Sequence, residues 1–515
     1  MKNFEKIIVS LAFCSLLSCE NKPKERYVTS CLFPDGATVE EKVRLAGHVV
    51  PSKRQLEWQK MEFTGFICYG INTFTDKEWG TGKEDPSLFA PTELDAGQWV
   101  KTAKESGMKM VLLTCKHHDG FCLWPSKYTD FSVASTPWKE GKGDLVREVA
   151  DACKEYGLKF AVYLSPWDMN HPDYGTDGYN DFFVNQLTEL LTQYGSVDEV
   201  WFDGACGEGP NGKKQVYDFK RYYETIRRLQ PEAVIAVMGP DVRWVGTETG
   251  YGRDTEWSVL PASVVNLSEI EESSQQEAGS GTFLPIGDKM KKDLGSRALL
   301  SQAKGAIWYP SEVDVSIRPG WYYHAKEDST VKSPQKLIDI YYSSVGKNSL
   351  LLLNIPPDKR GLIHENDSHS LKEMVRILNE TFKQNLLKTA PIASADVNLS
   401  ALTDNVLDTY WQGEGKSEKH VMEISFEGKQ RFDRLLLQEN ITEGQRIEAF
   451  TLECWLNNEW KSVAEGTTVG YKRILRFDPV ETEKVRIAIK QSRDLPQIAE
   501  LGLYKASAEE LSASK

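Results

Sequence analysis

Histidine and cysteine are scarce in this chain of 515 residues, which contains 8 of the first and 9 of the second. No two cysteines form a C-x-x-C pair, and the seven that follow residue 19 are an odd number. This usage excludes the disulfide framework of a small secreted domain and the usual zinc-ribbon spacing. We expect Cys115, Cys122, Cys153 and Cys206, which lie in hydrophobic or motif segments, to be buried or site-adjacent thiols.

Positive charge is also in short supply. The chain has 62 Lys and Arg against 75 Asp and Glu, which gives a formal net charge of −13. Because a protein that binds a phosphate backbone needs a basic surface, we expect no nucleic-acid partner. The 14 Trp and 20 Tyr offer flat rings that suit the apolar faces of sugars, although core packing uses the same residues.

Long apolar runs are missing beyond the N-terminus, so no mature membrane span is expected. Lys2 and Lys6 precede the short apolar run IIVSLAFCSLLS, and this order predicts a signal peptide. The run ends in Leu-Leu-Ser-Cys19 and resembles a bacterial lipobox, which implies a lipidated Cys19; a Sec signal cleaved elsewhere is the alternative. We expect a signal peptide at 1–19, a tether at 20–54, and a lipoprotein of the bacterial cell envelope, on an undetermined membrane face.

Short apolar runs alternate with amphipathic stretches from residue 55 to 385. One of the amphipathic stretches has Asp144 as a plausible N-cap and Gly157 as a plausible stop. Nearly continuous apolar strands predict a parallel sheet covered by helices, and the number of repeats favours a (β/α)₈-like barrel over a doubly wound sheet. A polar, Gly- and Ser-rich stretch at 262–300 predicts a long loop. The predicted strands are 63–71, 109–115, 159–165, 199–204, 234–240, 306–315 and 349–357, and the predicted helices are 97–107, 144–157, 181–195, 215–229, 334–346 and 370–382.

The character of the sequence changes after residue 385. Segments such as HVMEISFE, FDRLLLQEN and KVRIAIK are short and β-rich, which predicts an antiparallel β-sandwich over 386–508. The opening phrase LTDNVLDTYWQ (402–412) resembles discoidin-like or family-32-type carbohydrate-binding modules. Sugar binding and simple packing on the barrel are both compatible with this pattern.

Carboxylates, histidines and tryptophans follow the predicted barrel strands. The segments KHHDGFCLW, YLSPWD, WFDGACGEGP and GPDVRWVGTETG each begin where a strand is expected to end. Active sites of such barrels lie at the carboxyl ends of the strands, so these groups should meet there. Sugar hydrolysis uses this mixture of paired carboxylates, hydroxyl partners and aromatic walls.

The motifs KHHDGFCLW, WFDGACGEGPNG, PDVRWVG and SIRPGWYYH, in this order, resemble glycoside hydrolase family 29, the retaining α-L-fucosidases. The resemblance covers residues 55–385 and is closer to the branch that prefers α-1,3/1,4-linked fucose. It implies an exo-acting enzyme without cofactor or metal, whose partner is a fucosylated glycan. It also implies that Asp203, in EVWFDG, is the nucleophile, because the family's nucleophile is the Asp of this motif.

The resemblance implies a general acid/base on the loop after the fifth strand. Glu248 in RWVGTETG matches the family segment best, and Glu256 in DTEWS is the rival. The acid must begin the reaction protonated near neutral pH, which requires a raised pKa.

The remaining candidates concern the sugar pocket. Cys115, His117, His118 and Cys122 superficially suggest zinc, but adjacent side chains on an extended segment point to opposite sides, so we expect no metal site. The resemblance instead implies that both histidines bind sugar hydroxyls. The further candidates for substrate binding are Glu78, Trp79, Tyr163, Trp201, Arg243 and Trp321, of which the last four could equally be packing residues.

One position departs from the family pattern. The first-strand motif reads FICYGINTF, with Cys68 where the family usually has a His that contacts the sugar ring. Since a thiol is a weak hydrogen-bond partner, the change affects affinity or admits another sugar, such as an α-L-galactoside with its extra hydroxyl. A non-catalytic glycan-binding surface protein is the third hypothesis.

Overall fold

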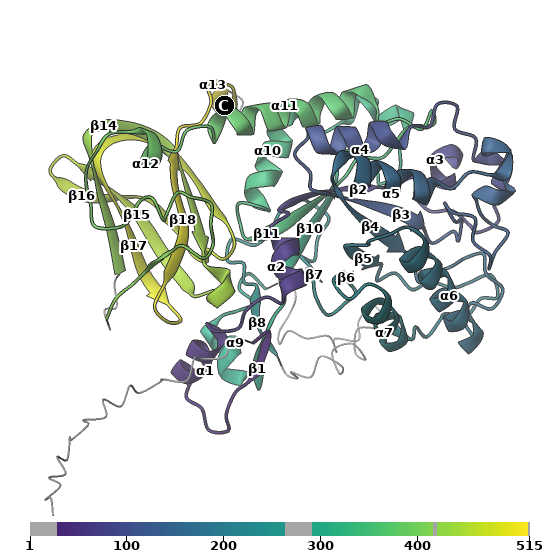
Figure 1. Cartoon of the computed structure of the whole chain (residues 1–515), viewed down its shortest axis with the longest axis horizontal. Helices are drawn as coiled ribbons and strands as arrows, with labels where there is room; N and C mark the ends of the chain where they lie inside the picture. The colour runs from purple at the N-terminus through teal and green to yellow at the C-terminus, as the bar shows by residue number, and fades with distance from the viewer. Residues whose placement is uncertain (1–27, 263–290, 416–419, 513–515) are drawn as a thin grey trace, which may run out of the picture.

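The computed structural model describes residues 28–262, 291–415 and 420–512, which form a barrel and a smaller β domain (Figure 1). The predicted signal peptide, Cys19 and most of the loop predicted at 262–300 lie outside the described residues. Among the helices of the described ranges, none combines the length and the apolarity that a bilayer crossing requires.

Eight parallel strands form the barrel, in the order β6-β5-β4-β3-β2-β11-β10-β7. The edge strands β6 and β7 are joined by an isolated bridge between Met238 and Arg243, so the barrel is nearly closed. The predicted barrel is thus confirmed. Its strands are β2 (Phe63–Ile67), β3 (Met110–Lys116), β4 (Lys159–Leu164), β5 (Glu199–Phe202), β6 (Val234–Val237), β7 (Arg243–Trp244), β10 (Ser311–Ser316) and β11 (Ser349–Asn354).

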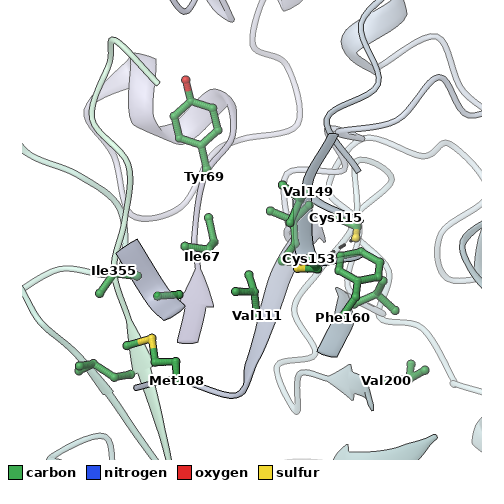
Figure 2. Close-up of a cluster of buried hydrophobic side chains, with 14 of the residues drawn as sticks. Ile67, Tyr69, Met108, Val111, Cys115, Val149, Cys153, Phe160, Val200 and Ile355 are labelled. Carbon is green, nitrogen blue, oxygen red and sulfur yellow. Dashed lines mark hydrogen bonds between the residues drawn. The ribbon is translucent and has the colours of Figure 1, made fainter. Parts of the chain in front are cut away.

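Helices cover the outside of the barrel and bury one face of its strands (Figure 1). In the α5 helix, Asp144 accepts a hydrogen bond from the Arg147 amide and Gly157 adopts a left-handed φ of 70°, so both predicted end signals are confirmed. Outward-facing Ile67, Val111 and Val200 belong to this outer core (Figure 2). The covering helices are α4 (Ala96–Glu105), α5 (Leu145–Tyr156), α6 (Asp177–Gln193), α7 (Phe219–Leu229), α10 (Pro334–Ser343) and α11 (Glu365–Thr381).

The strand predicted at 306–315 is wrong as a single element. Its first half, β9 (Gly305–Trp308), pairs antiparallel with β1 (Ser30–Leu32) and β8 (Val259–Ala262), whereas its second half is β10 of the barrel. Pro310 separates the two, and a proline has no amide to donate to a sheet.

The described part of the expected tether is folded. Helix α1 (Val39–Ala46) packs on the small sheet, with α9 (Arg297–Gln302) beside it. Helix α2 (Lys53–Gln59) lies at the amino-terminal end of the barrel, where the Trp58 indole donates a 2.6 Å hydrogen bond to Glu199, the first residue of β5. This end of the barrel is therefore filled by side chains.

The C-terminal domain is antiparallel, as predicted, with its own core of aliphatic and aromatic side chains. It contacts the amino-terminal end of the barrel; for example, the Glu256 amide donates to the Thr468 hydroxyl at 3.0 Å. The domain therefore lies away from the carboxyl ends of the strands (Figure 1). Its elements are α12 (Leu386–Thr389), β12 (Ile392–Ala395), β13 (Trp411–Gln412), β14 (His420–Glu439), β15 (Ile447–Leu456), β16 (Glu459–Gly466), β17 (Arg473–Ser492), β18 (Gln497–Tyr504) and α13 (Ala508–Ser512).

Candidate active site

Four neighbouring barrel strands each deliver a polar residue to the same end. Cys68, His117, Ser165 and Asp203 are the first residues after β2, β3, β4 and β5. Because adjacent parallel strands end at one edge, these four side chains are brought together although they are spread over more than a hundred positions of sequence.

Asp203 is held on both carboxylate oxygens. Oδ1 accepts the Ala205 amide at 2.7 Å, and Oδ2 accepts the Tyr163 hydroxyl at 2.9 Å. Burial and then the Asp203 charge raise the pKa of Tyr163 well above its usual value, so this hydroxyl keeps the proton that it donates. The Asp203 side chain is 26% exposed, so a ligand in the pocket can reach it.

Trp201 lies beneath Tyr163 and not on the pocket rim. The two rings stack at 5.1 Å with an interplanar angle of 23°, and the Trp201 indole donates at 2.8 Å to Glu312 inside the barrel. The position of Trp201 therefore does not support the predicted direct contact with substrate. Trp201 instead packs under the Tyr163 ring.

Sequence reasoning missed three carboxyl groups inside the barrel, those of Glu199, Glu312 and Asp314. All are buried, and burial is the main reason that their pKa values are raised; that of Glu312 rises to about 7. The available signal was the alternation in SEVDVS, which places Glu312 and Asp314 on the same face of β10.

His117 and His118 lie side by side. Their ring centroids are 4.0 Å apart, so the expectation that they point to opposite sides is wrong. β3 ends at Lys116 and the chain turns at His118, so the two histidines do not lie on an extended strand. A register shift between Thr114 and Lys116 in the pairing of β3 with β4 precedes them, and Lys116 donates to Gln186 of α6. His117 stacks on Tyr163 at 6.0 Å. In the described part of the chain, no group of three or more His, Cys, Asp or Glu side chains has the geometry of a metal site.

Glu248 lies on the loop after β7, exposed beside Trp321. Its Oε2 accepts the Trp321 indole at 3.2 Å. Burial raises the pKa of the Cys68 thiol; the hydrogen bond from Thr114 lowers it, and the charges of Glu78, Asp203 and Glu248 raise it further. Cys68 itself is buried and contacts the Thr114 hydroxyl at 3.5 Å.

Both carboxylate oxygens of Glu78 contact other residues of this chain. One oxygen accepts the Trp321 amide at 2.8 Å, and the other contacts His324 Nε2 at 2.7 Å. The next residue, Trp79, is 58% exposed and packs edge-on against His118 and against Trp167. Trp167 belongs to the strand-end segment YLSPWD but was not among the predicted site residues. Trp79 and Trp167 thus form an aromatic wall beside His118.

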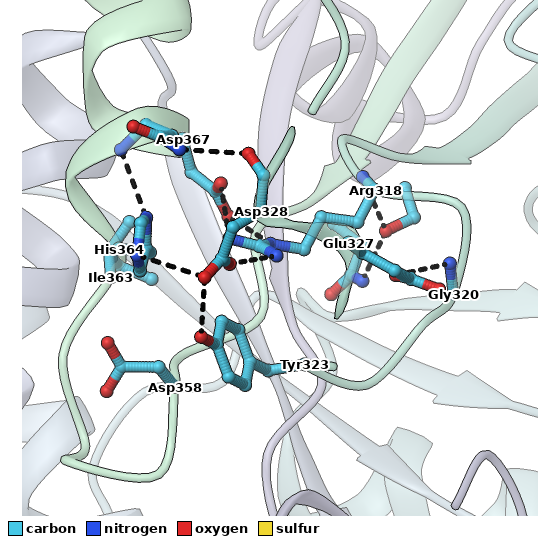
Figure 3. Close-up of polar contacts among 12 residues, drawn as sticks. Arg318, Gly320, Tyr323, Glu327, Asp328, Asp358, Ile363, His364 and Asp367 are labelled. Atoms are coloured by element: carbon cyan, nitrogen blue, oxygen red, sulfur yellow. Dashed lines mark hydrogen bonds and ion pairs between the residues drawn. The ribbon is translucent and has the colours of Figure 1, made fainter. Parts of the chain in front are cut away.

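A buried ion-pair cluster anchors the loop that carries Trp321 (Figure 3). Arg318 is fully buried and donates to both oxygens of Asp367 at 2.8 and 2.9 Å and to Asp328 at 2.9 Å. Asp328 also accepts the Tyr323 hydroxyl at 3.2 Å. The cluster fixes both ends of the segment between Arg318 and Asp328.

Arg243 and Glu256 are not brought to this site. Arg243 pairs in register with Ser311, the first residue of β10, and therefore lies at the opposite end of the barrel. Glu256 is fully buried there between Arg243 and Arg253, both within ion-pair distance. The predicted sugar contact by Arg243 is contradicted by this placement, and Glu256 is a structural carboxylate.

A family model described as α-L-fucosidase matches residues 49–381, well over half of the chain. The chain belongs to the α-L-fucosidase family, glycoside hydrolase family 29. Alpha-L-fucosidase 1 of Arabidopsis thaliana is 44% identical, over 88% of this chain and 87% of the plant protein. A structure from Bacteroides ovatus described as a putative α-L-fucosidase is 51% identical, with a TM-score of 0.82, over 93% of this chain and 78% of that one.

A further family 29 fucosidase, from Ruminococcus gnavus, was solved in complex with fucose. It is 29% identical to this α-L-fucosidase, with a TM-score of 0.76, over 90% of this chain and 96% of the other. Residues 390–501 match the F5/8 type C domain, which confirms the resemblance of the C-terminal domain to the discoidin-like class. The enzyme class inferred from the strand-end motifs is therefore confirmed.

Proposed function

We propose that this α-L-fucosidase is an exo-acting, retaining enzyme, with Asp203 as nucleophile and Glu248 as acid/base. A carboxylate oxygen of Asp203 attacks the anomeric carbon while Glu248 protonates the departing glycosidic oxygen, which gives a β-fucosyl ester. Glu248 then takes a proton from water, whose oxygen displaces Asp203 and restores the α-anomer. The balance of the two steps is hydrolysis of one glycosidic bond.

The two hydrogen bonds that Asp203 accepts are the observation that carries this proposal. An amide at 2.7 Å and a hydroxyl at 2.9 Å donate to the two oxygens of the Asp203 carboxylate and fix its direction. A preorganised anion at the carboxyl ends of barrel strands is what a nucleophile in this fold requires. In the part of the chain that the structure describes, Glu248 has one hydrogen bond, from the Trp321 indole, whereas the carboxylate of Glu78 is bonded on both oxygens, which supports Glu248 in the second role.

The nucleophile is tested with Asp203→Ala, an aryl α-L-fucoside and azide. Turnover should fall by roughly four to six orders of magnitude and return with azide, which attacks the free face and gives the β-fucosyl azide. Unchanged turnover in Asp203→Asn, or an α-azide from Asp203→Ala, contradicts the assignment.

The acid/base is tested by the opposite stereochemistry. In Glu248→Ala the fucosyl ester still forms from an activated aryl fucoside, and azide then displaces Asp203 to give the α-fucosyl azide. Glu256→Gln is the matched control, because it removes the charge of the rival carboxylate at the far end of the barrel. Loss of turnover in the control, with rescue by azide, would transfer the role to Glu256.

We propose a preference for α-1,3/1,4-linked terminal fucose, supported by the motif resemblance to that branch of the family. A panel of α-1,2-, α-1,3- and α-1,4-fucosylated oligosaccharides, together with an aryl α-L-galactoside, measures the preference by kcat/KM. Faster cleavage of the α-1,2 linkage refutes it, and faster cleavage of the galactoside would show that Cys68 changes the sugar accepted.

We also propose that the protein is a cell-envelope lipoprotein, supported by the lipobox-like run that ends at Cys19. Detergent-phase partitioning after expression of the full chain in a bacterium tests this, with Cys19→Ala as the comparison. Equal partitioning of the two proteins contradicts lipidation at this residue.

A further inference from the structure

Ser165 has one hydroxyl proton, and its place is determined. The Ser165 Oγ lies 2.7 Å from the Trp167 carbonyl oxygen, which can only accept. It also lies 2.7 Å from Nδ1 of His118. Since the Ser165 hydroxyl donates its one proton to the carbonyl, its oxygen must accept the hydrogen bond from His118, and His118 Nδ1 must carry a hydrogen.

The His118 ring is neutral. Burial is the larger reason, and the charge of Lys116 the second, that its pKa falls to about 3. Lys116 is fully buried, donates to Asp168 and Gln186 at 3.0 Å each, and lies over the rings of Phe182 and Phe183. The ammonium thus stays in place two positions before His118.

We infer that Ser165 holds His118 as the neutral Nδ1–H tautomer, so that its Nε2 lone pair faces the site and accepts a hydrogen bond from a sugar hydroxyl. Ser165 and Lys116 are positioning residues in this arrangement. The inference rests on the proposed function, because it takes the space beside Asp203 as the sugar pocket.

The geometry around Nε2 supports an acceptor. Nε2 lies 3.8 Å from Oδ2 of Asp203, beyond hydrogen-bond distance. Tyr163 already donates to that oxygen, and the neighbouring His117 is also neutral because burial lowers its pKa. A lone pair and a carboxylate therefore face each other, and the group that lies between them in the complex must be a donor, which a hydroxyl is and an ether or a fluorine is not.

The tautomer is measured directly on the free enzyme. Long-range proton–nitrogen correlation with ¹⁵N-labelled histidine distinguishes Nδ1–H, Nε2–H and the imidazolium, and the 8 histidines are few enough to resolve. A His118→Gln variant identifies the signal. We expect the Nδ1–H pattern, unchanged between about pH 5 and 8; an Nε2–H or imidazolium pattern overturns the inference, whatever the substrate proves to be.

The Ser165→Ala variant leaves the buried Nδ1–H without its acceptor. The tautomer should then shift toward Nε2–H, and kcat/KM for an aryl α-L-fucoside should fall by roughly ten- to a hundredfold. Ser344→Ala is the matched control, since Ser344 is equally buried and its hydroxyl also donates to a carbonyl at 2.7 Å, but at the end of α10. Equal losses in both variants, or a loss in Ser165→Ala without a change of tautomer, overturn the positioning role. A wild-type enzyme that cleaves no α-L-fucoside would instead refute the proposed function and leave the tautomer result standing.

Discussion

The buried cluster around Arg318 gives the most direct test of how this barrel supports its site. In Asp367→Ala the guanidinium loses two charge-assisted hydrogen bonds, of 2.8 and 2.9 Å, and keeps the one to Asp328. Both Arg318 and Asp367 are fully buried, so water cannot replace the lost oxygens. Removal of one partner from such a pair costs about 3–5 kcal/mol of unfolding free energy.

A surface pair supplies the comparison. Arg476 and Asp339 approach to 2.6 Å, closer than Arg318 and Asp367, but their side chains are 36% and 46% exposed. Exposed pairs contribute about 0–1 kcal/mol because water screens the charges. If burial and not distance determines the cost, Asp339→Ala should be nearly neutral.

Urea unfolding, followed by tryptophan fluorescence and by residual activity, measures both variants. We expect the Asp367→Ala midpoint to drop well below that of Asp339→Ala. Its kcat/KM should also fall in the absence of urea, because the loop anchored by Arg318 carries Trp321, the hydrogen-bond donor to Glu248. Equal midpoints for the two variants would refute the reasoning, and a destabilised enzyme with unchanged kcat/KM would refute the link to the site.

Two further predictions concern the site. Tyr163→Phe removes a hydrogen-bond donor to Asp203, so kcat/KM should fall by about ten- to a hundredfold, from about 1.5–3 kcal/mol; an unchanged kcat/KM contradicts this role. Burial lowers the pKa of His324, but its bonds to Asp76 and Glu78 outweigh burial and raise it. The two ion pairs of His324 therefore stabilise the fold fully below the pKa of His324 in the unfolded chain, about 6.5, and this stabilisation is lost as pH rises through the higher pKa in the folded protein. The melting-temperature difference between wild type and His324→Gln should shrink from about pH 6 to 8. A constant difference contradicts the assignment.

Some features of this enzyme could be read from the sequence because they are local. Asp203 directly follows an apolar strand, and an apolar strand in a repeating β/α pattern determines both where its side chains point and at which end of the barrel it stops. The caps of α5 are likewise encoded within a few residues, by Asp144 and Gly157. The barrel, the β domain and the position of the nucleophile candidate therefore needed no tertiary information.

Other features were decided only by contacts between distant segments. The register of β7 with β10 places Arg243, together with its partner Glu256, at the end of the barrel opposite to the site. Sequence distance could not reveal this, because Glu248 and Glu256 are only eight positions apart and yet lie in unlike environments, one exposed beside Trp321 and one fully buried. The identity of a charged residue is fixed by the sequence, whereas its partners, burial and protonation depend on which segments the fold packs around it.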